Sequence, residues 1–119
     1  MIVRLKVVVI CAFAIFTVVA CTTSSNKTFV IADSKSYEAS LFRQHCAICH
    51  GPEGNGRTLD NGMNVPSLRQ GQFKAPTEGA IENQITNGGN GMVPFRNTLT
   101  NREIKMMANF VYSDLRGNK

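Results

Sequence analysis

The stretch Cys46-Ala47-Ile48-Cys49-His50 decides how this chain is interpreted. Two thiols and an imidazole in the order C-x-x-C-H form the attachment signal for a c-type haem. Cysteines three positions apart lie on one side of a helical turn, so both sulfurs can add to the two vinyl groups of one haem. The histidine that follows is carried under the porphyrin, where a ring nitrogen can bind iron. The motif therefore predicts one covalent haem c held by Cys46 and Cys49, with His50 as an axial ligand.

Two other interpretations of the same residues find less support. His45, Cys46, Cys49 and His50 have the chemistry of zinc ligands, but structural zinc sites use two separated pairs. The sequence has no Cys or His after His50 to supply a second pair. A redox-active C-x-x-C of the thioredoxin type needs a βαβ context, which is absent. His45 directly precedes Cys46, so we expect it to face solvent or the haem edge, away from the iron.

An apolar leader precedes the rest of the chain. The first six residues include Arg4 and Lys6, and residues 7–20 are apolar at all but one position. A charged region followed by an apolar run is typical of an export signal. The run is shorter than the roughly 20 residues that a membrane-spanning helix needs. We therefore expect residues 1–20 to be a cleaved signal peptide, and the protein to be exported to the periplasm or the outer cell surface.

The leader ends in Val18-Val19-Ala20-Cys21, which resembles the bacterial lipobox, whose cysteine is acylated before cleavage in front of it. Val18 and Val19 depart from the commonest residues of that motif, and ordinary cleavage after Ala20 is the alternative. Lipidation is favoured because Cys21 would otherwise be an unpaired exported thiol. We expect Cys21 to be acylated and to anchor the protein to a membrane.

Charge and composition limit the classes of function that this chain can have. Without the two basic residues of the leader, 11 basic residues stand against 8 acidic ones, which gives a net charge of +3. This mild excess contains no basic cluster, so nucleic-acid binding gains no support. The chain also has no Trp among its 119 residues. A single small domain of this kind has a limited core, to which a buried haem would add a large apolar centre.

Residues 21–35 are rich in Thr, Ser, Asn and Lys and predict a flexible, lipid-anchored tether. Phe29-Val30-Ile31 interrupts this polar stretch, and it either packs on the domain surface or forms a short extended piece. The folded domain is then expected over residues 36–119. No run in it is a confident strand, so we expect an all-α domain.

A first helix is predicted from about Tyr37 to Cys46, with Ser34 or Ser36 as its N-cap. Gly51-Pro52 ends it, just after the haem motif. Glycines and prolines are frequent over residues 51–71, which indicates an irregular, wrapped loop.

Two further helices follow this loop. One is predicted from Thr77 to Asn87, with Ile81 and Ile85 one turn apart on the same face. The last has the strongest signal, because Thr100 and Glu103 match a capping box. Leu99 and Ile104 match the hydrophobic staple that often accompanies such a box. Its apolar face is formed by Ile104, Met107, Ala108, Val111 and Leu115.

A candidate for the second iron ligand lies in Gly91-Met92-Val93-Pro94-Phe95. A methionine thioether is soft and polarisable, and as an axial ligand it favours ferrous iron and raises the potential. The glycines before Met92 would let the backbone approach a flat porphyrin. Met63 lies in a glycine-containing loop and is a weaker candidate. Met106 and Met107 lie on the last helix and fit the core.

On these residues the chain resembles the class I mono-haem cytochromes c of bacteria, in a lipoprotein form. The similarity extends from Leu41–Gly51 to Phe110–Tyr112. It implies a small cytochrome c fold, in which three main helices and their loops wrap around one covalently bound haem. It also implies His50 and Met92 as axial ligands, and a backbone carbonyl of Pro66 that accepts a hydrogen bond from the haem histidine.

Two protein ligands leave no open position on the iron, so no small-molecule substrate should bind there. The protein is then expected to be an electron carrier and not an enzyme, and its partners to be redox proteins and a membrane. One alternative is a haem enzyme or gas sensor, which requires Met92 to be absent from the iron or displaced. Others are a haem subunit of a larger redox complex, and a non-haem module in which the C-x-x-C-H motif is accidental.

Overall fold

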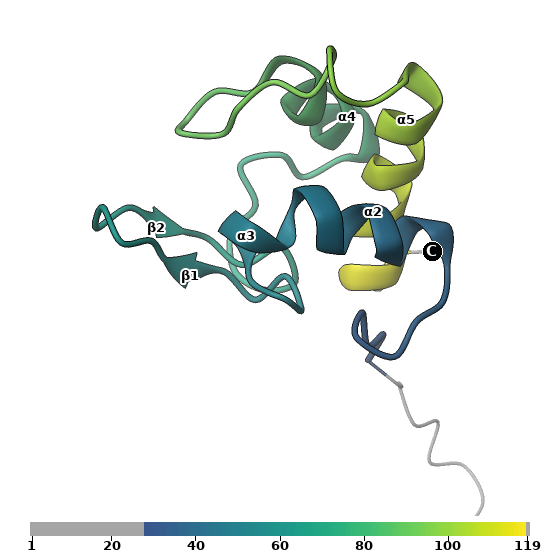
Figure 1. Ribbon diagram of the computed structural model, residues 1–119, viewed down its shortest axis with the longest axis horizontal. Coiled ribbons are helices and arrows are strands. Elements are labelled where there is room, and N and C mark those ends of the chain that lie inside the picture. Colours follow the sequence, from purple (N-terminus) through teal and green to yellow (C-terminus); the bar gives the residue numbers. More distant parts are fainter. Residues whose placement is uncertain (1–27, 119) are drawn as a thin grey trace, which may run out of the picture.

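The computed structural model describes residues 28–118. The predicted signal peptide and Cys21 lie outside the described residues. Within residues 28–118 no helix is long and apolar enough to cross a membrane. Helices and long loops make up most of this part (Figure 1). In chain order the elements are α2 (Tyr37–His45), α3 (Ala47–His50), β1 (Arg57–Thr58), β2 (Asn64–Val65), α4 (Glu78–Asn87), α5 (Asn101–Asn109) and the π-helix η2 (Phe110–Leu115).

The helix before the haem motif begins where the sequence predicts. The side chain of Ser36 accepts a hydrogen bond from the amide of Ala39 at 3.2 Å, which satisfies one of the free amides of the first turn. The backbone leaves regular helix at Cys46 (φ −112°, ψ −36°) and resumes as α3. Gly51 ends α3 with a φ of 80°, a conformation that favours glycine. The motif thus lies on a short helix that continues α2.

The starts of the two later helices are also confirmed. The side chain of Thr77 caps α4, which buries Ile81 and Ile85. Thr100 and Glu103 make both hydrogen bonds of the predicted capping box at the start of α5. These features depend on residues within one or two turns of each other, which explains why the sequence reveals them.

The last helix changes its winding after Asn109. Phe110–Leu115 form a π-helix, whereas the sequence predicts one regular α-helix through Leu115. The spacing of apolar residues does not distinguish a short π-helical segment from a regular α-helix. Phe110, Val111 and Leu115 are buried there, as the apolar face predicts. The segment therefore keeps its place in the core despite the altered hydrogen bonding.

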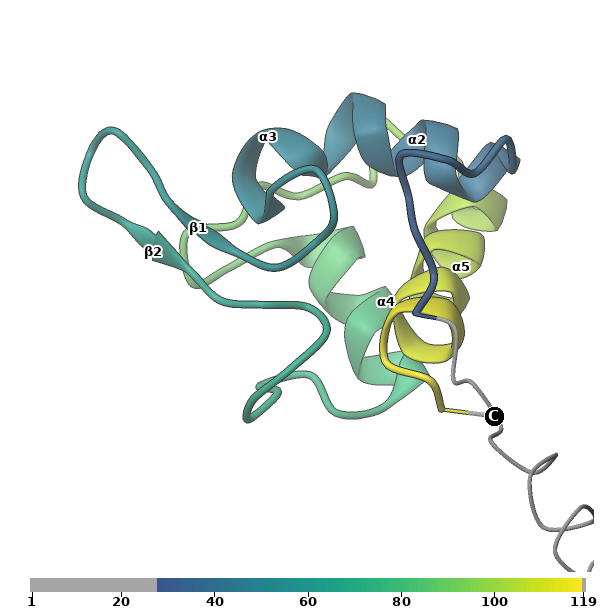
Figure 2. The ribbon, with the colours of Figure 1, turned by 90° about the horizontal axis from the view of Figure 1, so that it is seen from below.

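The core lies where three helices meet. α4 packs against α5, and α5 also packs against α2. Figure 2 shows α2 above α4 and α5. The largest fully buried side chains are Phe42, Phe110, Ile31, Ile104 and Met107. This apolar centre fixes the two segments that matter for the site, namely α3 at the end of α2 and the loop between α4 and α5.

A small hairpin accompanies the helices, which form the domain as predicted. β1 and β2 pair antiparallel, with Arg57 opposite Val65 and Thr58 opposite Asn64. Strands of two residues are too short to show an alternating pattern, so the sequence gives no signal for them. The hairpin contributes no residue to the buried core, which the helices and their connecting segments form.

The segment Phe29–Ser34, here called the N-terminal strap, packs on the domain. Ile31 is fully buried, and the ring of Phe29 meets that of Phe110 edge-to-face with centroids 5.3 Å apart. Of the two alternatives for Phe29-Val30-Ile31, packing on the domain is therefore the one observed. The predicted tether over residues 21–35 extends too far, because an apolar tripeptide gains more from burial than from exposure.

A surface contact links α2 to α5. The Tyr37 hydroxyl donates a hydrogen bond to the carboxylate of Glu103, which also accepts hydrogen bonds from Thr100. The bond from Tyr37, followed by those from Thr100, lowers the pKa of Glu103 to about 2. A depressed carboxyl pKa stabilises the fold above the ordinary pKa of 4.5, and this stabilisation is lost as the pH falls toward about 2.

The variant Tyr37→Phe should therefore show a stability deficit that depends on pH. We expect the deficit to be constant above about pH 4.5 and to shrink as Glu103 becomes protonated at lower pH. Urea unfolding followed by circular dichroism at several pH values between 2 and 7 measures it. Tyr112→Phe is the control, since it removes a hydroxyl elsewhere. A deficit that is the same at every pH would contradict this role of the Tyr37–Glu103 bond.

Candidate haem site

The C-x-x-C-H motif occupies one compact turn. The carbonyl of Cys46 accepts hydrogen bonds from the amides of Cys49 at 3.2 Å and His50 at 2.9 Å, so the whole motif is closed on itself. Cys46 is half-buried and Cys49 is exposed, and both thiols are free. Burial, and to a lesser extent the nearby Cys49, raises the pKa of Cys46 to about 12, which keeps its thiol protonated at neutral pH. The structure thus places two thiols and one imidazole on the same turn.

His50 is half-buried, and its environment favours the neutral imidazole. Burial lowers the pKa of His50, and the carbonyl of Pro66 partly opposes this by raising it. Nδ1 is buried and has no hydrogen bond of ordinary geometry, so the contact with the carbonyl is looser than a full bond. A neutral imidazole is the form that binds a metal. The structure therefore places the Pro66 carbonyl close to the His50 ring.

A glycine makes the approach of Pro66 to the motif possible. A Cβ at Gly56 would lie 2.4 Å from the Val65 carbonyl oxygen and 2.8 Å from the Pro66 carbonyl carbon. The amide of Gly56 also donates to the His50 carbonyl at 2.9 Å. The backbone at Gly56 is therefore held between the histidine and the proline.

Met92 lies in a tight turn after α4. Its amide and carbonyl exchange hydrogen bonds with Gly89 at 3.0 and 2.8 Å, and Asn90 inside the turn has a φ of 54°. Met92 is half-buried and packs against the core. In the described residues no hydrogen bond ties this turn to α3. Met92 and His50 thus come from separate segments that are each anchored to the same core.

Comparison with known proteins gives this arrangement a family. The family model described as "Cytochrome C oxidase, cbb3-type, subunit III" matches residues 38–111, which is more than half of the chain. The chain belongs to this family of c-type cytochromes. With a single C-x-x-C-H motif, it is a mono-haem cytochrome whose cofactor is covalently bound haem c.

Similar proteins support this assignment. Cytochrome c6 of Thermosynechococcus vestitus is 30% identical over 102 residues, which cover 86% of this chain and 85% of that protein. Cytochrome c6 of Gracilaria tenuistipitata var. liui is 28% identical over 99 residues, which cover 83% and 89% respectively. The solved structure of "KustC0563 c-type cytochrome" has 32% sequence identity and a TM-score of 0.55, and covers 65% of this chain and 95% of its own. The prediction of a small cytochrome c fold is confirmed.

The side chains of the cytochrome fit one haem c. The two free thiols of Cys46 and Cys49 suit the two vinyl groups of one haem. His50 Nδ1 is buried, has no hydrogen bond of ordinary geometry and lies near the Pro66 carbonyl. The exposed side chain of Met63, at 39%, lies beside the Met92 turn and suits a porphyrin face. Cys46 and Cys49 would hold the haem and His50 would bind its iron. The bound iron supplies a one-electron redox couple.

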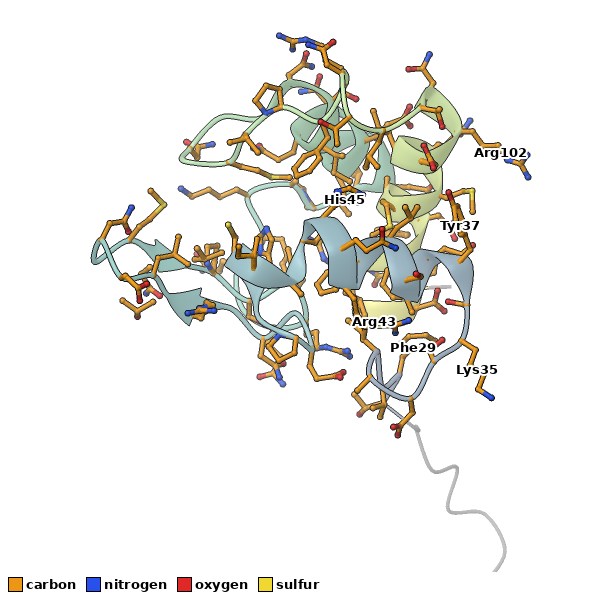
Figure 3. The ribbon with its side chains drawn as sticks, viewed as in Figure 1. Phe29, Lys35, Tyr37, Arg43, His45 and Arg102 are labelled. Atoms are coloured by element: carbon orange, nitrogen blue, oxygen red, sulfur yellow. The ribbon has the colours of Figure 1, made fainter. Side chains whose placement is uncertain are left out.

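Two residues weighed in the sequence take distinct places in the cytochrome. His45 points from α2 toward the loop after α4 (Figure 3), where its ring meets Phe95 edge-to-face with centroids 6.3 Å apart. Met63 lies beside Gly91, because a Cβ there would be 2.8 Å from the Met63 sulfur. Met63 is thus a neighbour of the Met92 turn, although it belongs to the hairpin loop.

Sequence reasoning missed Glu53 and Arg69. Their side chains join the segment after His50 to the segment after Pro66 through an ion pair of 3.3 Å between Glu53 Oε2 and Arg69 Nη2. A lone acidic and a lone basic residue 16 positions apart form no local pattern. Only the fold reveals that they meet.

The glycine that starts the Met92 loop offers a test of this geometry. A Cβ at Gly88 would lie 2.5 Å from the Met92 carbonyl oxygen and 2.7 Å from the Pro94 nitrogen, and the φ of Gly88 is 68°. Gly88→Ala should cost about 3 kcal/mol, from backbone strain and overpacking together. Gly62→Ala should cost only about 1 kcal/mol, from strain alone, because Gly62 has a similar φ of 81° but no atom within 4 Å.

Urea unfolding of the haem-loaded variants measures the two costs. We expect Gly88→Ala also to weaken any iron ligation that depends on the Met92 turn. Equal costs at the two glycines would show that the close packing around Gly88 is unimportant.

Proposed function

We propose that this cytochrome is a one-electron carrier whose haem iron has His50 and Met92 as its axial ligands. Cys46 and Cys49 would form the two thioether bonds, and Pro66 would support His50 through its carbonyl. The protein would do no bond chemistry on a substrate. It would set the potential of the iron through the ligands and their surroundings, and exchange electrons with partner proteins.

The observation that carries this proposal is the setting of Met92. Met92 belongs to a turn that is closed by hydrogen bonds with Gly89, and its carbonyl lies close to Gly88. Met92 also packs on the same core that fixes α3. A ligand held this way resists displacement, because moving it would break the turn and its packing. An iron with two fixed ligands changes little in geometry between its oxidation states, which favours rapid electron exchange.

The number and positions of the histidines argue against a haem enzyme. The sequence has two histidines, of which His50 is the expected iron ligand. The other, His45, packs against Phe95 and stays on α2. A general acid or base at the distal face, on which peroxidase chemistry depends, has no evident source.

Ligand binding by the ferrous holoprotein tests the proposal. Wild-type protein with its haem attached should show the ferric sulfur–iron absorption band and should bind carbon monoxide poorly. Rapid self-exchange of electrons, measured by nuclear magnetic resonance line broadening, should accompany the band. Avid carbon monoxide binding by the wild type would instead favour the sensor or enzyme alternative.

Exposed apolar side chains near the site suit a transient redox partner. Ile48, inside the haem motif, and Val93, next to Met92, are exposed at 74% and 64%. Contacts between electron-transfer partners are small and short-lived, so a modest apolar patch is sufficient. The partners would be proteins, and the mild positive charge favours acidic surfaces on them.

We also propose that the cytochrome is exported and tethered to a membrane through acylated Cys21. The apolar leader ending in Val-Val-Ala-Cys and the polar residues after it support this. Cys21→Ser should release the domain into the soluble fraction or leave an unprocessed precursor. Membrane fractionation with detection of the haem measures the distribution. Normal processing together with unchanged membrane retention in this variant would argue against lipidation.

A second candidate function is that of a haem subunit in an oxidase complex. The description of the matching family model, a subunit of a cbb3-type cytochrome c oxidase, favours it. The site chemistry would be the same in both roles, since the domain would pass single electrons. Gentle detergent extraction followed by native electrophoresis separates them: a carrier migrates alone, whereas a subunit migrates with a large complex.

A further inference from the structure

We propose that Glu53 and Arg69 form a positioning latch that holds the Pro66 carbonyl against His50 and fastens the N-terminal strap behind it. This inference rests on the proposed ligation by His50. Neither side chain would touch the haem, so both act through the segments that carry His50 and Pro66.

The latch begins with a buried guanidinium. The side chain of Arg69 is only 6% exposed, and its Nη2 lies 3.3 Å from Glu53 Oε2. Arg69 Nε donates a hydrogen bond to the backbone carbonyl of the same glutamate. Arg69 therefore grips both the side chain and the main chain of Glu53, which fixes the loop at that point. A bidentate grip of this kind suits arginine and not lysine.

The two partners occupy matching positions relative to the site. Glu53 follows His50 by three residues, and Arg69 follows Pro66 by three residues. A hydrogen bond of 2.9 Å from the Leu68 amide to the Gly54 carbonyl joins the same two segments. Arg69 and this hydrogen bond thus join the two segments next to the contact between Pro66 and His50.

The N-terminal strap is bound to the same pair. Glu53 accepts hydrogen bonds from the amides of Ile31 at 2.8 Å and Ala32 at 2.9 Å. Arg69 Nη2 donates to the carbonyl of Phe29 at 2.8 Å. The strap therefore covers the ion pair and holds it in a partly dry environment, where the interaction is stronger than in water.

A second arginine holds the strap without touching the loop. Arg43 Nη1, on α2, donates to the carbonyls of Ile31 at 2.7 Å and Ser34 at 3.0 Å. Figure 3 shows Arg43 directed from α2 toward the segment that carries Phe29. Arg43 and Arg69 are thus a natural pair for comparison: both bind the strap, but only Arg69 binds Glu53.

Loosening the latch should change the properties of the iron and not stability alone. A hydrogen bond to the second nitrogen of an iron-bound imidazole makes it a stronger donor, and loss of such a partner typically changes metal binding by tenfold or more. An imidazole that donates less electron density stabilises ferric iron less, which favours the ferrous state. We therefore expect Arg69→Met to raise the reduction potential by an amount equivalent to about a tenfold change in the redox equilibrium, or about 59 mV for one electron.

The experiment compares Arg69→Met and Glu53→Gln with Arg43→Met, all as haem-loaded full-length protein. Reduction potentials come from redox titration, and amide hydrogen exchange reports on Gly54, Gly56 and Leu68. For both latch variants we expect a raised potential and faster exchange at these amides. Arg43→Met should loosen the strap with the potential unchanged. If Arg69→Met yields too little protein, Glu53→Gln, which keeps the shape of the side chain, carries the test alone.

Two results would overturn the latch. One is an unchanged potential in Glu53→Gln or Arg69→Met, whatever the effect on exchange, because the pair would then be only structural. The other is an equal shift in Arg43→Met, because the strap and not the ion pair would then act on the site. The ferric sulfur–iron band of the wild type tests ligation by Met92 separately, so its absence would refute the proposed His50/Met92 function and not the latch on the His50 side.

Discussion

The double variant Cys46→Ala, Cys49→Ala is expected to lose its covalent haem completely and to accumulate little folded protein. The thioether bonds need both thiols, which lie free on the turn around α3. The core of the described domain is formed by only a few large side chains around Phe42 and Phe110. A domain of this size gains much of its stability from a bound cofactor, so the apo form should be degraded or aggregate.

Haem staining after denaturing electrophoresis, together with acid–acetone extraction, measures this result. In the wild type the haem should stay with the polypeptide, because thioether bonds survive unfolding. Cys21→Ser is the matched control, since it removes a cysteine outside the motif and should leave the stain unchanged. Complete extraction of haem from properly matured wild-type protein would refute covalent attachment at this motif.

Met92→Ala should have the second large effect. Loss of the thioether would open a coordination position, so ferrous protein should bind carbon monoxide readily. The potential should fall by on the order of 0.1 V, because axial ligands set haem potentials over a range of about 0.8 V. The ferric sulfur–iron band should disappear, and electron self-exchange should slow because the iron would gain or lose a ligand at each transfer.

Two other methionines provide controls for Met92→Ala. Met106→Leu changes a half-buried residue on α5, and it should leave the band and the potential intact. Met63→Leu is a stricter control, because the Met63 sulfur lies beside Gly91 in the Met92 turn. Its volume is nearly conserved, so we expect a small shift and a retained band. A band that survives in Met92→Ala but vanishes in Met63→Leu would reverse the assignment of the ligand.

Local interactions explain which parts of the fold the sequence predicts. The caps at Ser36, Thr77 and Thr100 each satisfy an amide within three residues, so the chain encodes them without reference to the rest of the fold. The apolar spacing of Ile81 and Ile85 identifies a buried face for the same reason. The C-x-x-C-H motif is equally local, and its geometry within one turn could be anticipated.

The features that the sequence does not predict depend on distant residues. Arg69 meets Glu53 across 16 positions and Phe29 across 40, and no periodicity marks such pairs. Ile31 is buried against helices that come later in the chain. The polar residues around it, taken alone, predict a tether. The π-helix and the hairpin likewise arise from packing and loop closure, to which propensities respond weakly. Met92 and Cys21 remain predictions, because their roles depend on an iron and a lipid.

If Cys21 is acylated as proposed, the bound N-terminal strap would also limit how far the haem can move from the bilayer. Because Phe29 is already bound to the domain, only eight Cα–Cα steps separate it from Cys21, a reach of at most about 28 Å. A tether this short would confine the haem to a thin layer over the lipid surface. Encounters with a partner in the same membrane would then become a search in two dimensions, at a higher effective concentration than that of a freely diffusing carrier of the same abundance.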